Sequence, residues 1–314
     1  MQDLILIFGL VAPVFIIIIL GYILKRFNLV NENFVSISSK IVFNISLPAL
    51  LFSEIIRMDA SQILDFNLVI YCCIGTFFCF GASWLLSYRY MNKPRDRAVF
   101  IQGSFRSNSA IMGLALVANI FGENSLGKAA LVLAFTIPLF NILSIIALTI
   151  PFRQEKKLNI FQTLFEITKN PLTMAVLLAL PFSIFRINLD GIFSKTLSYL
   201  SALTMPLALL GIGATMNMKD IKNAPPISYY ASILKIVLFP FVTTYIAYLI
   251  GFKDLEMGII FILFSTPTAI ASFVMSEAME CNSKLAAHII LLSTVGSILT
   301  ITLGLYLLRT FYII

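Results

Sequence analysis

The sequence is poor in charged side chains. Only 12% of its 314 residues are Asp, Glu, Lys or Arg, whereas 59% are hydrophobic. Soluble domains of ordinary composition carry about 25% charged residues, so the composition excludes a water-soluble globular protein and predicts an integral membrane protein. The hydrophobic runs are near twenty residues long and lack the alternation of outer-membrane strands, so we expect an all-α membrane protein.

The side chains that usually build catalytic or metal centres are also scarce. The chain has four cysteines, which lie in or beside apolar runs without metal-ligand spacing, and a single histidine, His288. No Ser/His pair, paired aspartates or metal constellation is evident, and no two adjacent acids lie deep in a hydrophobic run. We therefore expect neither an enzyme nor a protein with a cofactor, bound metal or disulfide framework.

Charge of one sign is in excess, with a formal net charge of +7. The basic residues sit in short loops between apolar runs rather than in a patch or tail. This placement argues against a nucleic-acid partner and is typical of residues that orient a protein in the lipid bilayer.

Hydropathy and helix breakers predict ten transmembrane helices, grouped in two sets of five. The predicted first set occupies 1–150, a polar cytoplasmic linker 151–170, and the second set 171–314. The ten expected spans are 4–24, 35–55, 66–88, 98–121, 126–150, 171–185, 192–215, 227–250, 256–279 and 285–308.

The distribution of basic residues predicts how the protein is oriented. Fourteen of the 22 Lys and Arg residues fall on one side of the predicted spans and six on the other. By the positive-inside rule the first side is cytoplasmic, so we expect a multi-pass protein of the cell (inner) membrane with both termini outside. The remaining two, Arg106 and Lys235, lie inside predicted spans.

Two polar stretches interrupt predicted spans, one in each half of the chain. Residues 105–113 read FRSNSAIMG in the fourth span, and residues 264–272 read FSTPTAIAS in the ninth, where Pro267 marks the break. A charged side chain such as Arg106 is costly at bilayer depth, so it should face protein or water rather than lipid. Paired interruptions of this kind point to a transporter's binding site.

The chain also repeats itself. Sliding the sequence by 158 residues sets residues 47–51 against 205–209, and sliding it by 159 sets Phe105, Ala110 and Ile111 against Phe264, Ala269 and Ile270. Five spans is an odd number, so the second copy must enter the membrane upside down. The sequence therefore predicts two inverted repeats of five helices, with breaks in the fourth and ninth.

Three segments carry a family resemblance: NISLPALLF at 44–52, the Arg106-Ser107-Asn108 pattern with Gly113, and the break at Pro267. Together they resemble the auxin efflux carrier family, and the resemblance covers essentially the whole chain. The family includes plant auxin exporters and bacterial carriers for which malate, malonate and related carboxylates are proposed substrates. The resemblance implies a fold like that of sodium/proton antiporters and bile-acid symporters. In such a fold the first, second, sixth and seventh helices form a scaffold, and the other six form a transport domain. The resemblance thus implies that the broken fourth and ninth helices cross at the membrane centre.

The expected crossover chemistry favours an anion. Ser107, Asn108 and Ser109 are good N-cap types for a second half-helix starting near Ala110, and in the ninth span Thr266 before Pro267 fits an N-cap and first helical position. Both new N-termini would direct partial positive charge to the centre. The predicted substrate-binding residues are Asn108, Ser107, Ser109, Arg106, Thr266, Thr268, Ser46, Asn44 and Asn141.

Several of these assignments have alternatives. The hydroxyls could satisfy broken backbone only, Asn44 and Ser46 could form helix–helix hydrogen bonds near Pro48, and Asn141 could belong to a kink needed for packing. Gly211 and Gly213 favour close helix contact, including at the interface of a homodimer.

The two intramembrane cations allow three interpretations. Arg106 and Lys235 could bind the substrate anion, neutralise the carbonyl ends of half-helices in place of a sodium ion, or form structural ion pairs. Glu54 and His288 are the weaker candidates for proton coupling, because both lie near span ends. The coupling ion is left open, with a proton favoured over sodium.

These observations predict a secondary active transporter that moves a small organic anion, such as a mono- or dicarboxylate, by alternating access. Two alternatives remain at this point. One is a sodium-coupled organic anion symporter of the bile-acid type, and the other is a ligand sensor or channel that does not transport.

Overall fold

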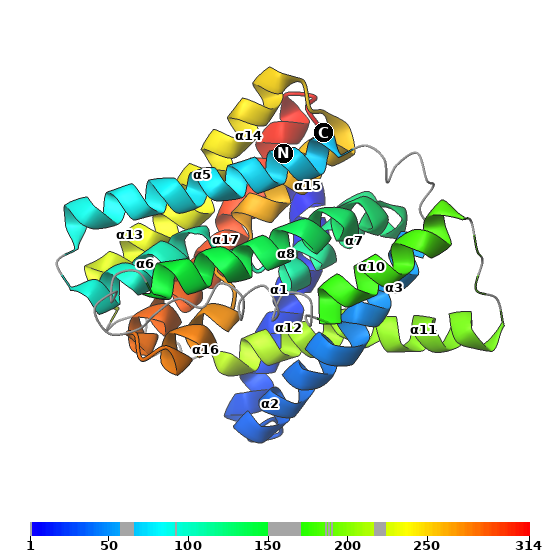
Figure 1. Ribbon diagram of the computed structural model, residues 1–314, viewed down its shortest axis with the longest axis horizontal. Helices are drawn as coiled ribbons and strands as arrows, with labels where there is room; N and C mark the ends of the chain where they lie inside the picture. The colour runs from blue at the N-terminus through cyan, green and yellow to red at the C-terminus, as the bar shows by residue number, and fades with distance from the viewer. Residues whose placement is uncertain are drawn as a thin grey trace.

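The computed structural model describes residues 2–56, 66–91, 93–149, 171–185, 187, 189, 191–216 and 224–314. In these ranges the chain is helical and contains no strand (Figure 1). Seven helices are long and apolar enough to cross a membrane. The all-α membrane class is therefore confirmed. The predicted linker 151–170 lies outside the described residues.

The helices follow one another along the chain as α1 (Gln2–Arg26), α2 (Glu32–Ile41), η1 (Val42–Ser46), α3 (Leu47–Ile56), α5 (Asn67–Tyr90), α6 (Pro94–Phe105), η2 (Ser109–Gly113), α7 (Leu114–Phe121), η3 (Glu123–Ser125), α8 (Leu126–Thr149), α10 (Pro171–Ile184), α11 (Ile192–Ala202), α12 (Thr204–Thr215), α13 (Pro226–Ile233), η6 (Leu234–Leu238), α14 (Phe239–Ile250), α15 (Asp254–Ser265), α16 (Ala271–Ala278) and α17 (Ser283–Thr310). The interrupted fourth span is α6, η2 and α7, and the interrupted ninth is α15 and α16.

Two of the π-helical turns are explained by prolines. Pro48 follows η1 and Pro240 follows η6. A proline inside a helix removes a hydrogen bond and clashes with the carbonyl four residues earlier, here that of Asn44 or Ile236. The extra residue of a π turn widens the helix at that point. In η6 this widened turn carries Lys235, the fully buried lysine of the eighth predicted span.

Glycines allow α1 and α12 to pack with their backbones in contact. A Cβ at Gly21 would collide with the carbonyl oxygen of Leu210, and a Cβ at Gly213 would collide with that of Ile18. Small residues at helix interfaces permit such approach inside membranes. The close contact expected at Gly213 is therefore confirmed, whereas a Cβ at Gly211 would meet no heavy atom within 4 Å.

The surface is apolar, and much of the polar chemistry lies inside. Large hydrophobic side chains are exposed, including Ile192 at 84% and Leu85 at 73%, whereas Gln102 and Lys235 are almost fully buried. This inverted distribution suits a protein whose outer surface meets lipid, because lipid cannot hydrogen-bond polar groups.

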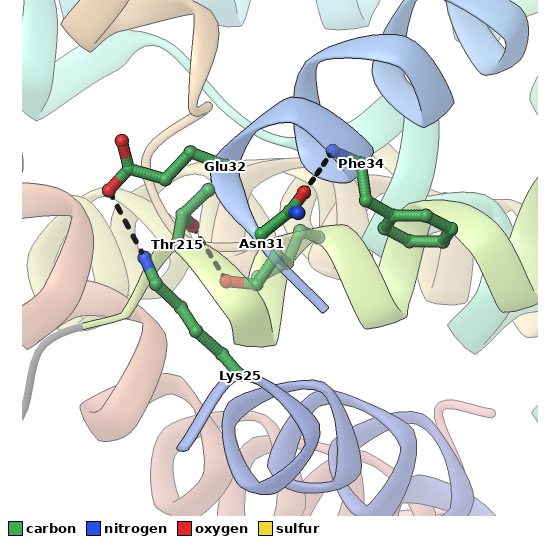
Figure 2. Close-up of polar contacts among 6 residues, drawn as sticks. Lys25, Asn31, Glu32, Phe34 and Thr215 are labelled. Carbon is green, nitrogen blue, oxygen red and sulfur yellow. Dashed lines mark hydrogen bonds and ion pairs between the residues drawn. The ribbon is translucent and has the colours of Figure 1, made fainter. Parts of the chain in front are cut away.

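The ends of neighbouring helices are tied by local polar contacts. Figure 2 shows the turn between α1 and α2, where Asn31 accepts a hydrogen bond of 2.8 Å from the Phe34 amide and so caps α2. In the same view the ammonium of Lys25 lies 3.7 Å from the carboxylate of Glu32. Cap residues of this type satisfy amides that the first helical turn leaves open.

Candidate functional site

The two interrupted helices meet at a short antiparallel pairing of extended backbone. Ser107 and Thr268 form an isolated bridge, although 161 residues separate them. The Asn108 amide donates to the Pro267 carbonyl at 2.8 Å, and the Ala269 amide donates to the Arg106 carbonyl at 3.2 Å. Each broken segment therefore satisfies part of the backbone that the other exposes, as a break in a buried helix requires. We call residues 106–109 and 266–269 the crossover.

The crossover segments differ from the expected caps. Thr266 ends α15 with an extended backbone (φ −60°, ψ 145°), and α16 begins only at Ala271. The prediction that Thr266 and Pro267 open the second half-helix is therefore wrong, because Thr266 is the C-cap of α15 and Pro267 belongs to the extended pairing. Asn108 does precede the second half of the fourth span, which starts as the π turn η2, but its side chain makes no capping hydrogen bond.

The carbonyl ends of the first half-helices are satisfied by side chains from other elements. Thr268 donates its hydroxyl to the Gly103 carbonyl of α6 at 2.6 Å. Lys235 donates its ammonium to the Phe264 carbonyl of α15 at 2.5 Å. A cation is favourable at a helix C-terminus, where the unpaired carbonyls carry partial negative charge. Lys235 thus lies at the second break, as a cation that neutralises a half-helix end.

The other side of the crossover has polar groups without partners. Among buried side-chain atoms, the hydroxyl oxygens of Ser104, Ser107, Ser109 and Ser272 have no hydrogen-bond partner within the described part of the chain. Asn108 is 6% exposed, and its amide group makes no hydrogen bond there either. Buried polar groups are nearly always satisfied, so a cluster of open donors and acceptors is a binding-site signal.

Arg106 supplies the charge of this site. Its side chain is 7% exposed, and its guanidinium donates to the Asn141 side-chain oxygen at 2.7 Å, to the Ser144 hydroxyl at 2.8 Å and to the Met275 sulfur at 3.0 Å. All three partners are neutral. Within the described residues the guanidinium forms no ion pair, so the interpretation of Arg106 as half of a structural ion pair has no support there.

A second polar side chain extends this cluster. Gln102, one turn before Arg106 on α6, donates to the same Met275 sulfur at 3.7 Å and accepts from the Ser276 hydroxyl at 3.1 Å. Sequence reasoning missed Gln102, Ser144 and Met275. The spacing of Ser144 three residues after Asn141 was an available signal, because these positions share one face of a helix.

The structure brings most predicted site residues together and leaves four outside these contacts. Asn44 is exposed and donates to the Lys40 carbonyl at 2.8 Å, and Ser46 is buried and donates to the Ile41 carbonyl at 3.5 Å, each within its own helix. Glu54 is half-buried on α3. His288 is half-buried on α17, and its Nδ1 has no partner among the described residues.

The described residues also contain no group of three or more His, Cys, Asp or Glu side chains that could hold a metal ion. Among the described side chains, the charged groups at the crossover are those of Arg106 and Lys235. The arrangement can therefore hold a small anion through open hydroxyl and amide donors beside a fixed guanidinium.

Comparison with known proteins agrees with this geometry. A family model described as "Membrane transport protein" matches residues 6–305 of the chain. The chain belongs to that family. The match spans nearly the whole sequence and confirms the resemblance to auxin efflux carriers at the level of the family.

Individual members of the membrane transport protein family align over nearly their full length. An "Uncharacterized transporter" of Methanothermobacter thermautotrophicus is 25% identical over 93% of this chain and 95% of its own. A second, of Methanocaldococcus jannaschii, is 27% identical over 93% and 96%. A protein of Rhizobium meliloti named "Putative malonate transporter" is 24% identical over 96% of both chains. The chain is thus similar throughout to membrane transporters.

Proposed function

We propose that this membrane transport protein is a secondary transporter of a small organic anion that binds at the crossover. The observation that carries the proposal is the set of unpartnered groups of Ser107, Asn108 and Ser109 beside the guanidinium of Arg106. An anion can accept hydrogen bonds from these donors and supply the negative charge that the described surroundings of Arg106 lack. Malonate is a suitable probe because one relative carries it in its name.

The proposal includes a topology of ten spans arranged as two inverted repeats. Seven long helices, the interrupted pairs α6–α7 and α15–α16, and α10 together account for ten. The repeat is supported by matching contacts at helix starts. Asn282 before α17 donates to Asp96 of α6 at 2.7 Å, and Lys128 of α8 pairs with Glu256 of α15 at 3.0 Å. In each pair the last helix of one half is tied to the broken helix of the other.

In this topology the protein crosses the cell membrane with its more basic side in the cytoplasm and both termini outside. Alternating access would expose the crossover to one side and then the other. The scaffold would include α1 and α12, whose glycine-mediated contact suits a rigid unit. The crossover elements would form the moving part.

A specific observation bears on the sodium-coupled alternative. The carbonyl end of α15, where a bound cation would be favourable, already holds the ammonium of Lys235. This argues for coupling to a proton, or for no coupling ion, over sodium. The sensor or channel alternative predicts ligand binding without saturable flux or counterflow.

The proposal is tested by thermal stabilisation of the purified protein with a panel of mono- and dicarboxylates including malonate, with and without sodium. A ligand that binds only the folded state at 100 times its Kd stabilises it by about 2.7 kcal/mol. We expect a carboxylate to raise the melting temperature without sodium, and Asn108→Ala to abolish the rise. Asn124→Ala, the same change at an exposed position, is the matched control and should retain it.

Two outcomes would count against the proposal. If no anion in the panel stabilises the protein, the crossover does not bind a carboxylate. If the rise persists unchanged in Asn108→Ala, the anion binds elsewhere.

A further inference from the structure

In the described part of the chain, the buried side chains with a formal charge are all basic. Among the side chains that the structure describes, the buried ionisable ones with a formal charge are Arg106 at 7% exposure and Lys235 at 1%, and no Asp or Glu is buried. Among the described residues, the side chain of Arg106 donates to the neutral groups of Asn141, Ser144 and Met275, and that of Lys235 donates to the Phe264 carbonyl. The described interior therefore holds two basic side chains and no acidic one.

The helix dipoles at the crossover do not cancel this charge. Two half-helices, α6 and α15, present their C-terminal ends there, and two, starting at η2 and α16, present their N-terminal ends. The partial charges at the two kinds of helix end are opposite and similar in size, so they offset each other in pairs. The positive charge of the two side chains remains.

Both cations lie close to the proposed substrate site. Arg106 directly precedes Ser107 and Asn108, and Lys235 binds the carbonyl of Phe264, two residues before Thr266. Phe264 lies in the last turn of α15, so its carbonyl is within one helical turn, about 5.4 Å, of Thr266. At such separations in a protein, the electrostatic energy between two unit charges is large. It changes an equilibrium or rate constant by roughly tenfold or more.

We propose, on the basis of the proposed function, that these two cations make the protein an anion exchanger, because the crossover changes sides rapidly only with an anion bound. When the crossover is open to either side, water can solvate the positive charge. In the closed intermediate between the two open states no water is available, and an unpaired buried charge is costly. A dicarboxylate bound at the first break would bring two negative charges beside Arg106 and near Lys235, so the loaded protein passes this intermediate more easily than the empty one.

The test compares two fluxes of radiolabelled malonate from proteoliposomes of the full-length wild-type protein. Exchange is measured with unlabelled malonate outside, and net efflux with none outside. In net efflux the crossover must return to the inner side without a bound anion after each release. In exchange it returns with malonate bound. We expect exchange to be at least about tenfold faster than net efflux. An imposed membrane potential should change the rate of net efflux and leave the rate of exchange unchanged.

The Lys235→Met variant isolates one of the two charges. It removes the ammonium and retains much of the side-chain volume, so net efflux should accelerate relative to exchange and the ratio of the two rates should fall severalfold. Lys235→Arg keeps the charge and should keep a high ratio. Lys128→Met is the matched control, because Lys128 is partly exposed and is paired with Glu256 away from the crossover. It should leave the ratio at the wild-type value.

The outcomes separate this inference from the function on which it rests. Saturable flux with equal rates of exchange and net efflux in the wild type would overturn the exchanger inference and leave anion transport standing. Absence of malonate flux under both conditions would overturn both. The ratio of exchange to net efflux in the wild type, and the effect of membrane potential on each rate, test the exchanger inference even if Lys235→Met does not fold. If that variant folds and keeps the wild-type ratio, Lys235 has no part in the effect.

Discussion

The two breaks of the crossover share a backbone plan and differ in what their side chains do. At the second break, Thr266 donates to the Leu263 carbonyl at 3.2 Å and Thr268 donates to the Gly103 carbonyl at 2.6 Å. At the first break, the hydroxyls of Ser107 and Ser109 have no partner in the described part of the chain. Both breaks carry small polar residues, so composition alone does not distinguish a group that holds the fold from one that is open to a ligand.

The side chains of the two breaks make different contacts. At the second break the polar side chains already have partners within the protein. Its threonine hydroxyls donate to carbonyls, and Lys235 donates its ammonium to the carbonyl end of α15. The first break leaves donors open beside Arg106, whose hydrogen bonds all run to α8 and α16. The two breaks therefore differ: the side chains of the second hold the fold together, and those of the first leave open donors where the proposed anion would bind. Mutations at the second break should therefore lower stability, and mutations at the first break should lower the affinity for the ligand.

The largest effect is expected from Arg106→Met, which removes the charge of the first break. Losing one member of a buried charge interaction costs roughly 2 to 5 kcal/mol, so the affinity for malonate should fall at least about 30-fold. Arg106→Lys keeps the charge but not the planar fork, and should fall between this variant and the wild type. Isothermal titration calorimetry would measure both. Wild-type affinity in Arg106→Met would restrict the guanidinium to a structural role.

The next effect contrasts the two breaks directly. Thr268→Val keeps the shape of the side chain but leaves the buried Gly103 carbonyl without its hydroxyl donor, which should cost about 1 to 2 kcal/mol of stability. The melting temperature without ligand should fall, while the Kd for malonate stays within about threefold of the wild type. Loss of malonate binding in a folded Thr268→Val protein would mean that the second break also contacts the ligand.

Some features of the two breaks can be predicted from the sequence. The breaks, their pairing across the repeat and the cationic residues Arg106 and Lys235 follow from polar residues inside hydrophobic spans, where they are too costly to be accidental. The family and the all-α membrane class follow in the same way. These features depend on local composition and spacing.

The partners of those residues were not predictable in the same way. Thr266 was expected to be the N-cap of the second half-helix and is instead the C-cap of α15, because the position of a half-helix start depends on the extended segment that pairs with it. The Gly103 carbonyl finds Thr268, and the Phe264 carbonyl finds Lys235, through contacts between elements far apart in sequence. Such contacts depend on how the helices pack, which the hydrophobicity pattern does not determine.

A smaller effect is expected at the open hydroxyls of the first break. Ser107→Ala and Ser109→Ala remove groups that have no partner among the described residues, so neither should lower the melting temperature of the ligand-free protein, and either could raise it. Each should weaken malonate binding about three- to tenfold, the equivalent of one neutral hydrogen bond. Ser293→Ala is the matched control, since its hydroxyl accepts from the Thr268 amide at 3.1 Å and its loss should lower stability. Equal destabilisation by all three substitutions would remove the distinction between the breaks.

The smallest effect is expected outside the crossover, at the ion pair between Lys128 and Glu256. The Nζ–Oε1 distance is 3.0 Å, and both side chains are 27% exposed, so water screens the pair. Partly exposed pairs contribute less than about 1 kcal/mol. Lys128→Gln should therefore lower the melting temperature slightly, and the loss should shrink further in high salt. The Kd for malonate should not change, because the pair joins the starts of α8 and α15, a full half-helix away from the break. A tenfold change in that Kd would mean that the start of α15 is coupled to the binding groups of the first break, and the two breaks would then have to be treated as one unit.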